Sequence, residues 1–130
     1  MKYDNKQVMS MFCALTPAEH ERLALLSEEL GEAQQAIGKI MRHGYSTRNP
    51  VASTPWDNRG ELEKELGDVS FAMRLMIDTG DVTEDGIEAF RQSKAKNIQP
   101  YLHHNTIPRD YLQGSVCPTC GLDHSNIPQD

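Results

Sequence analysis

Two short acidic patterns, each with its carboxylates three residues apart, are the part of this sequence best suited to chemistry. The first pattern is EELGE and the second is ELGD; their paired acids are Glu29 with Glu32 and Glu65 with Asp68. At about 100° per residue on a helix, Glu29 and Glu65 each fall in the middle of an apolar stripe. Glu32 and Asp68 lie about 60° to one side. Each helix therefore carries an acid pair on the face expected to be packed.

Four carboxylates on packed faces need a cation. A buried carboxylate without a partner costs several kcal/mol or takes up a proton, and four of them facing one another would repel. Magnesium removes this difficulty, because it prefers oxygen ligands and commonly bridges to substrate phosphates. The alternative is a solvated face or a set of ion pairs, which is the usual meaning of one Glu-rich helix. Two pairs, both centred in apolar stripes, favour the metal site.

The order of the two motifs resembles a known family. EExxE followed after a spacer by ExxD, over about residues 16–100, resembles the signature of the MazG-like all-α nucleoside triphosphate pyrophosphohydrolases. The flanking GKIMRHG and NRGEL are similar to compact phage and bacterial members. Members of this family are helical, usually dimeric or tetrameric, and need Mg²⁺. They cleave nucleoside triphosphates between the α and β phosphates, which gives a monophosphate and pyrophosphate.

The resemblance implies a role for each acid. Glu29, Glu32, Glu65 and Asp68 are expected to hold Mg²⁺, with Mn²⁺ as a possible substitute. Glu28, at the edge of the stripe, is expected to support a ligand or to help position the attacking water. Glu28 and Glu29 are therefore the expected catalytic residues.

Three further residues are candidates for substrate binding. The resemblance implies that Lys94 and Asn97 meet the phosphates, whereas the alternative is a pair of surface residues near a helix end, where a cation suits the helix dipole. Trp56 is the only tryptophan and falls in a predicted loop. Anchoring of that loop is its favoured role, and stacking on the nucleobase is the second candidate.

The first acid pair belongs to a long predicted helix. Thr16, Pro17 and Glu19 form a strong helix start, because Thr16 caps, Pro17 suits the first turn and Glu19 completes a capping box. The helix is expected to run to about His43 and to stop at Gly44 in a left-handed conformation. Residues 44–57 are rich in Gly, Ser, Thr, Asn and Pro, which predicts a loop.

The second acid pair belongs to another long helix. Asn58 with Glu61 forms a capping signature, and this helix is expected to run to about Thr79 before a glycine. A third helix is expected to begin at residues 83–85 and to end before Pro100. We therefore predict an all-α fold, in which two long antiparallel helices carry EExxE and ExxD.

Composition and net charge indicate how the chain assembles and which classes of partner it can bind. Of 130 residues, 38% are hydrophobic and 6% aromatic, so a large self-sufficient core is not expected. We expect the bundle to be completed across a homodimer or within a homotetramer. A net charge of −6 argues against nucleic acid as a partner. No run approaches the roughly 18 apolar residues of a membrane span, and no signal-peptide core is present, so we expect no membrane partner.

The cysteines and the C-terminal residues complete the prediction. The three cysteines make an odd count, which fits a reduced, cytoplasmic setting. We divide the chain into a helical domain, residues 1–100, and an irregular tail, residues 101–130, with a single CxxC at Cys117 and Cys120. A structural zinc site needs four ligands, and His124 with either His103 or His104 would complete a Cys₂His₂ set. One CxxC is weak evidence, so an unliganded tail is favoured over zinc. The alternatives to the enzyme are a non-catalytic, metal-stabilised helical bundle and a zinc-tail adaptor protein.

Overall fold

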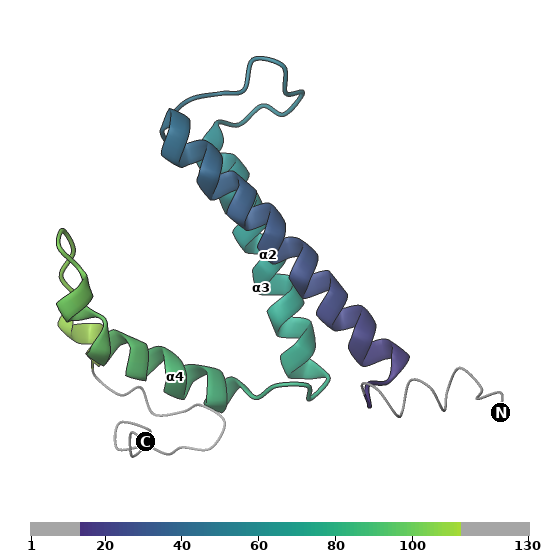
Figure 1. Cartoon of the computed structure of the whole chain (residues 1–130). Helices are drawn as coiled ribbons and strands as arrows, with labels where there is room; N and C mark the ends of the chain where they lie inside the picture. The colour runs from purple at the N-terminus through teal and green to yellow at the C-terminus, as the bar shows by residue number, and fades with distance from the viewer. Residues whose placement is uncertain (1–13, 113–130) are drawn as a thin grey trace, which may run out of the picture. The chain divides into compact units, whose positions relative to one another are not determined.

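The computed structural model describes residues 14–112, and no strand occurs among them. The helices are α2 (Pro17–His43), α3 (Asn58–Asp78) and α4 (Glu84–Asn97), followed by two short 3₁₀ helices, η1 (Gln99–Tyr101) and η2 (Arg109–Leu112). Figure 1 shows α2 and α3 lying side by side. The chain forms two compact units, Met1–Asp81 and Val82–Asp130, so that α2 and α3 share one unit and α4 belongs to the other. The predicted all-α class is confirmed.

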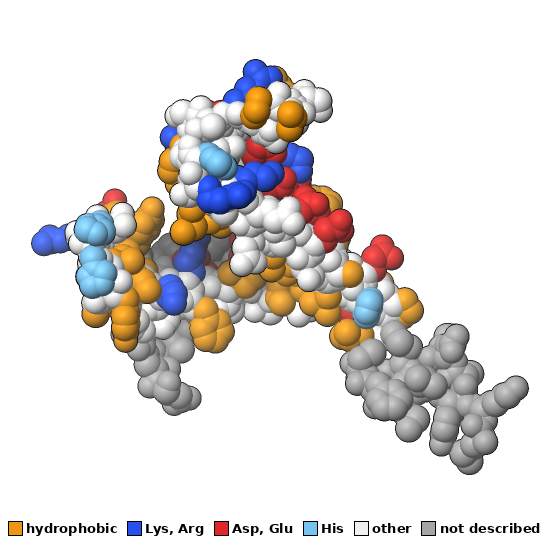
Figure 2. Space-filling view, turned by 45° about the horizontal axis from the view of Figure 1, so that its top comes forward, with side chains coloured by type: hydrophobic (Ala, Val, Ile, Leu, Met, Phe, Trp, Pro, Cys, Tyr) orange, Lys and Arg blue, Asp and Glu red, His pale blue; other side chains and the backbone are white. Residues whose placement is uncertain are grey.

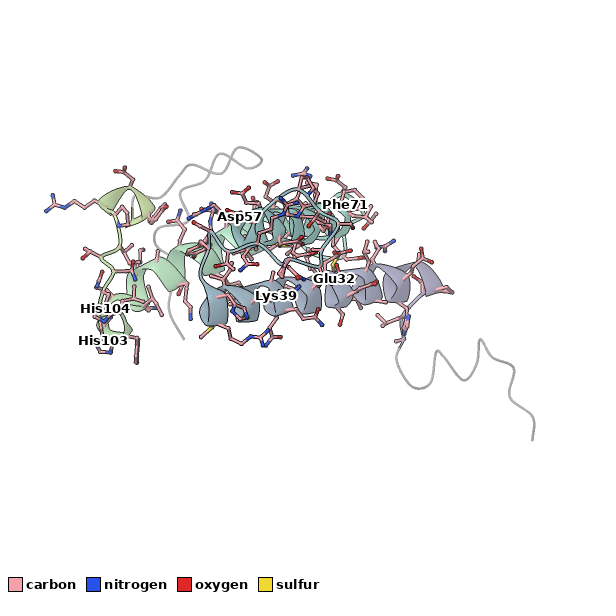
Figure 3. The ribbon with its side chains drawn as sticks, turned by 90° about the horizontal axis from the view of Figure 1, so that it is seen from above. Glu32, Lys39, Asp57, Phe71, His103 and His104 are labelled. Atoms are coloured by element: carbon pink, nitrogen blue, oxygen red, sulfur yellow. The ribbon has the colours of Figure 1, made fainter. Side chains whose placement is uncertain are left out.

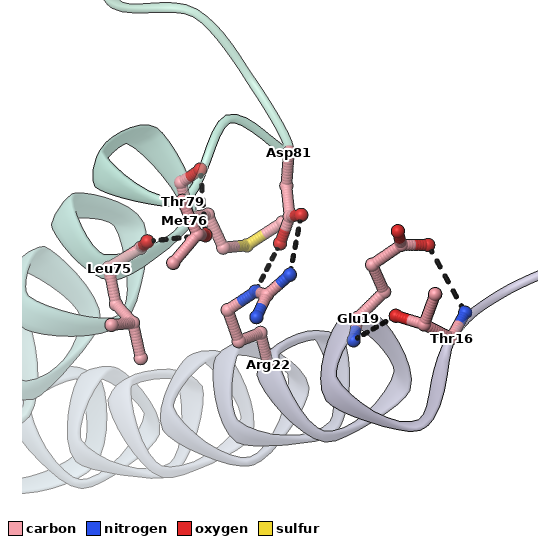
Figure 4. Close-up of polar contacts among 7 residues, drawn as sticks. All are labelled: Thr16, Glu19, Arg22, Leu75, Met76, Thr79 and Asp81. Carbon is pink, nitrogen blue, oxygen red and sulfur yellow. Dashed lines mark hydrogen bonds and ion pairs between the residues drawn. The ribbon is translucent and has the colours of Figure 1, made fainter.

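The capping box predicted for α2 is present. The Glu19 N–H donates to the Thr16 hydroxyl at 3.2 Å, and the Thr16 N–H donates to a Glu19 carboxylate oxygen at 3.4 Å (Figure 4). At the other end, the Gly44 N–H donates to the Ile40 carbonyl at 2.7 Å. Gly44 has φ 82° and ψ 171°, so the stop needs glycine, although it is extended rather than the left-handed helical turn that we expected.

The cap of α3 differs from the prediction. Asp57, not Asn58, is the N-cap, and its carboxylate accepts from the Gly60 N–H at 3.0 Å. Asn58 is the first helical residue; it is buried, and its side-chain amide donates to the Gly44 carbonyl at 3.0 Å. Glu61 bonds a loop hydroxyl instead of reaching back to the helix start. Two neighbouring residues could each cap, and the path of the chain from α2 decides between them.

Three alanines and one methionine of the described chain are buried where α2 and α3 meet. Ala33 and Ala36 of α2 and Ala72 and Met76 of α3 are the buried hydrophobic residues among those described. Because alanine keeps two helix axes close, this contact also brings together groups on neighbouring turns. The acids predicted as metal ligands lie on those turns.

An ion pair ties the start of α2 to the turn that follows α3. The Arg22 guanidinium donates twice to Asp81, with distances of 2.5 and 2.8 Å (Figure 4). The hydrogen bond from Arg22 lowers the pKa of Asp81 below its usual value. The stabilisation is therefore present above the ordinary pKa of an aspartate and is lost as the pH falls through the lowered one.

The loop between α2 and α3 is anchored to the start of α3. The Asn58 N–H donates to the Thr47 carbonyl at 2.9 Å, and the Arg59 N–H donates to the Tyr45 carbonyl at 3.0 Å. The Arg59 guanidinium also lies over the Tyr45 ring, 4.4 Å from its centre. Both ends of α2 are thus fixed against α3, which holds the two helices in one register.

In the second unit, α4 begins and ends where the sequence predicted. Thr83 caps it by accepting from the Gly86 N–H at 3.1 Å, and the helix ends before Pro100. Both 3₁₀ helices contact α4. The Gln99 side chain ties η1 to the segment that follows, because it donates to the Asn105 carbonyl at 3.0 Å and accepts from the Ile107 N–H at 2.8 Å.

Two predictions stay open in this part of the chain. The division at residue 100 into a domain and an irregular tail stays a prediction. Cys117, Cys120 and His124 lie outside the described residues, so the choice between zinc and an unliganded tail does too. None of the helices in residues 14–112 combines the length and the hydropathy that crossing a bilayer requires.

Candidate metal centre

The contact between α2 and α3 brings acids from both helices together. Glu29 of α2 and Glu65 and Asp68 of α3 each offer a carboxylate oxygen, and these three oxygens lie within 4.8 Å of one another. The i, i+3 spacing on α3 places Glu65 and Asp68 on neighbouring turns of one face. An all-oxygen set of this size suits a hard divalent cation.

Glu32, the fourth predicted ligand, joins the same cluster. Figure 3 shows it on the side of α2 next to α3. Its pKa is raised, first by a side-chain hydrogen bond with Glu65, then by the charge of Glu65, by burial and by the charge of Glu29, while Lys64 opposes the shift. All four predicted ligands are therefore brought together, and the neighbouring carboxylates favour the protonated form of Glu32.

This raised pKa has a consequence for the stability of the metal-free protein. Between the ordinary pKa of a glutamate and the raised pKa of Glu32, the folded state holds a proton that the unfolded state has released. Stability therefore falls as the pH rises through that window. A divalent cation held by these carboxylates would neutralise their charge and remove this penalty.

One oxygen of the cluster has no donor. Glu29 Oε2 is shielded from solvent and has no hydrogen-bond partner. Glu65 is only 9% exposed. A buried carboxylate oxygen without a donor is destabilising, and in native proteins it commonly marks an ion or a water. The donor set and the orphaned oxygen both fit a bound cation.

Lys64 is a residue of this site that the sequence prediction missed. Its ammonium lies 3.2 Å from both carboxylate oxygens of Glu65 and 2.9 Å from Asp68 Oδ2. These contacts raise the pKa of Lys64, with the hydrogen bond to Asp68 as the largest cause and that to Glu65 next. The signal was in the sequence, since Lys64 precedes Asp68 by four residues on one helix. One ammonium offsets only part of the charge of four carboxylates.

We predict that replacing Lys64 with Gln tightens the binding of Mg²⁺. The metal has to displace the ammonium from Glu65 and Asp68, and a half-exposed pair of this kind contributes about 0.2–1 kcal/mol. The half-saturating Mg²⁺ concentration should therefore fall by roughly two- to fivefold, as measured by titration calorimetry. Arg74→Gln is the control, because it removes the same charge from α3 where Arg74 pairs with Asp78. Unchanged or weaker binding by Lys64→Gln would mean that Lys64 does not compete with the metal.

The structure favours one of the two roles weighed for Trp56. Its side chain leans on the first turn of α3, since a Cβ added at Gly60 would stand 2.5 Å from Trp56 Cβ and 2.9 Å from Cγ. Gly60 is therefore needed for this close approach. At 40% exposed, Trp56 packs as an anchor of the loop, and stacking on a base stays a prediction.

The remaining predicted site residues are Glu28, Lys94 and Asn97. Glu28 is exposed on α2, and its role in positioning water stays a prediction. Lys94 and Asn97 lie on α4, in the second unit. Lys94 is exposed, and the Asn97 amide lies 3.4 Å from the Ser93 hydroxyl. Their contact with substrate phosphates also stays a prediction.

The acids on α2 and α3 thus form a compact anionic centre that a hard cation can neutralise. Such a cation lowers the pKa of a bound water and offsets charge on phosphoryl oxygens. No protein-family model, no curated protein and no solved structure matches this chain.

Proposed function

We propose that this protein is a Mg²⁺-dependent nucleoside triphosphate pyrophosphohydrolase that cleaves between the α and β phosphates. One observation carries the proposal: four carboxylates from α2 and α3 converge, and one buried oxygen, Glu29 Oε2, has no donor. The resemblance of EExxE and ExxD to the MazG-like family supplies the substrate class. The net charge of −6 also suits a small, metal-bound nucleotide better than a nucleic acid.

The site residues would bind the metal, orient water or bind the substrate. Glu29, Glu32, Glu65 and Asp68 hold the metal, for which Mn²⁺ can substitute, and Glu28 orients the attacking water. When bound, the metal supplies a more acidic water and neutralises charge that builds on the phosphoryl oxygens. Lys94 and Asn97 hold phosphates, and Trp56 is the candidate for the base. Such an enzyme acts on the cytoplasmic nucleotide pool.

The products test the proposed function. A panel of canonical and modified triphosphates, assayed with Mg²⁺ or Mn²⁺, should give a monophosphate and pyrophosphate. In ¹⁸O-labelled water the label should enter the monophosphate, because water attacks the α-phosphorus. EDTA should abolish the reaction, and Ca²⁺ should restore it less than Mg²⁺, since Ca²⁺ is larger and tolerates looser geometry. A diphosphate with orthophosphate as the main products would refute the assignment. Metal binding without hydrolysis of any triphosphate would favour the metal-stabilised bundle.

We further propose that α2 and α3 act as an antiparallel pair whose bundle is completed by a second copy. Leu23, Leu30 and Ile37 follow one another at seven-residue spacing on α2, and they are 41%, 51% and 45% exposed. Three apolar side chains at this spacing form the kind of seam that joins helices of two subunits. A homodimer or homotetramer would bury it.

This assembly predicts the mass in solution. Light scattering at micromolar concentration should give at least a dimer, and Leu30→Asn should shift it toward the monomer. Val51→Asn is the control, since Val51 is 89% exposed in the loop and should leave the mass unchanged. A monomeric wild type would contradict the proposed assembly.

A further inference from the structure

A cleft of roughly 260 Å³ lies where α2 meets the following loop. Four basic residues line it, namely Lys39, Arg42, His43 and Arg48, together with Asn49 and Asn58. Figure 2 shows Lys and Arg side chains beside a histidine near this loop, with Asp and Glu side chains next to them. The cleft belongs to the unit that carries the acids, so its position relative to them is fixed by α2 itself.

The Lys and Arg side chains of this cleft form no ion pair within the described part of the chain. Ion pairs there engage Arg22, Lys64, Arg74 and Arg91. None engages Lys39, Arg42 or Arg48, although Arg48 donates to the Thr54 carbonyl at 2.9 Å. Cations gathered at one cleft without a carboxylate among its lining residues create a local field that attracts anions. The partial negative charge at the C-terminal end of α2 offsets only part of this field.

The spacing along α2 connects the cleft with the metal centre. Lys39 follows Glu32 by seven residues and His43 follows it by eleven, so both lie within about 20° of Glu32 around the helix. Lys39 is about 10 Å farther along the axis than Glu32. Figure 3 shows Glu32 and Lys39 at successive positions on α2. An elongated anion held at the acids through a metal can therefore extend along one face of α2 toward the cationic side chains.

We propose that this cleft binds the terminal phosphoryl groups of the triphosphate and holds them until they leave as pyrophosphate. Guanidinium groups suit this ligand, since each can donate two parallel hydrogen bonds to phosphate oxygens. The identity of the substrate rests on the proposed function, whereas the affinity of the cleft for pyrophosphate does not. Lys94 and Asn97 are predicted for the same phosphoryl groups on the basis of resemblance, and the cleft is a separate set of donors on the unit that holds the acids.

Binding of inorganic pyrophosphate to the full chain in EDTA tests the cleft without hydrolysis or metal. Calorimetry should detect binding by the wild type that weakens with salt, with orthophosphate binding less tightly and sulfate serving as the reference for non-specific anion binding. Arg42→Gln combined with Arg48→Gln should weaken pyrophosphate binding by about tenfold or more. Arg74→Gln combined with Arg91→Gln removes the same charge elsewhere and should change it by less than about twofold.

A second variant guards against disturbance of the loop. Lys39→Gln combined with Arg42→Gln leaves the Arg48 contact with Thr54 intact and should weaken binding in the same way. Failure of the wild type to bind pyrophosphate, or equal affinity in the cleft and control variants, would overturn the inference.

Hydrolysis assays separate this inference from the proposed function. If the protein hydrolyses triphosphates, both cleft variants should raise KM by about tenfold and change kcat less. Hydrolysis with an unchanged KM in the cleft variants would remove the cleft from the site and leave the proposed function standing. Absence of hydrolysis in a wild type whose cleft still binds pyrophosphate would remove the proposed function and leave the anion site standing.

Discussion

Replacement of Glu65 with Gln is expected to abolish hydrolysis and to raise the melting temperature of the metal-free protein. Glu65 is 9% exposed and shares its surroundings with Glu29, Glu32 and Asp68, while Lys64 is the one cation that contacts it among the described residues. Glutamine keeps the shape of the side chain and removes its charge. Without metal, that change relieves like-charge repulsion and the cost of burying an ionised group.

In the presence of Mg²⁺, Glu65→Gln is expected to be harmful, because it removes a ligand of the metal. Loss of a partner that merely orients a metal ligand costs about 10–100-fold, so the loss of a ligand itself should cost more than about a hundredfold in activity. Mg²⁺ should raise the melting temperature of the wild type, because it binds the native state, and should raise that of Glu65→Gln much less. Thermal melts of the wild type and of Glu65→Gln, each with and without Mg²⁺, test the stabilities, and one hydrolysis assay tests the activity. Glu63→Gln is the matched control, since Glu63 is exposed two residues earlier on α3.

A purely structural role for Glu65 predicts different results. If Glu65 served only as the ion-pair partner of Lys64, then Glu65→Gln would lower the melting temperature with or without metal. A lower metal-free melting temperature together with retained activity would overturn the assignment of Glu65 as a ligand. Any change of similar size in Glu63→Gln would show that net charge, rather than the cluster, is responsible.

Helical periodicity made the placement of the acids predictable. Glu29 and Glu65 fall at the centre of apolar stripes. Packing of those stripes against each other brings the carboxylates together, and this does not depend on the conformation of the loops. Local signals also sufficed for the start of α2, where the side chains of Thr16 and Glu19 bond each other's N–H groups. The position of an acid on its own helix and the capping box of α2 each depend only on residues close together in the sequence.

Other features depended on the path of the chain through irregular segments. Asp57 and Asn58 are both good caps, and only the direction in which the loop enters α3 selects Asp57. The cleft lined by Arg42 and Arg48 depends on that same loop, which has no periodicity to read. Ile37 follows Glu29 by eight residues, which is about 80° around the helix, and it is 45% exposed, so it lies at the edge of the apolar stripe.

The second large effect is expected for Ala72→Leu. Ala72 is 1% exposed, and Ala33 and Ala36 are the buried residues on α2, so the helices meet through methyl groups. Three added heavy atoms have no space there unless α2 and α3 move apart. Overpacking of this kind costs about 1–3 kcal/mol, which corresponds to a fall in melting temperature of roughly 5–20 °C for a unit of this size. Ala24→Leu, at an exposed position on α2, should have little effect.

The same variant tests whether the alanine contact holds the metal centre together. Ala72 lies one turn after Asp68, so a wider separation of the helices at Ala72 also separates the acids of α3 from Glu29. At a temperature where Ala72→Leu is still folded, its half-saturating Mg²⁺ concentration should therefore be higher than that of the wild type, and Ala24→Leu should keep the wild-type value. Unchanged stability and unchanged Mg²⁺ binding in Ala72→Leu would mean that the close approach of α2 and α3 does not build the site.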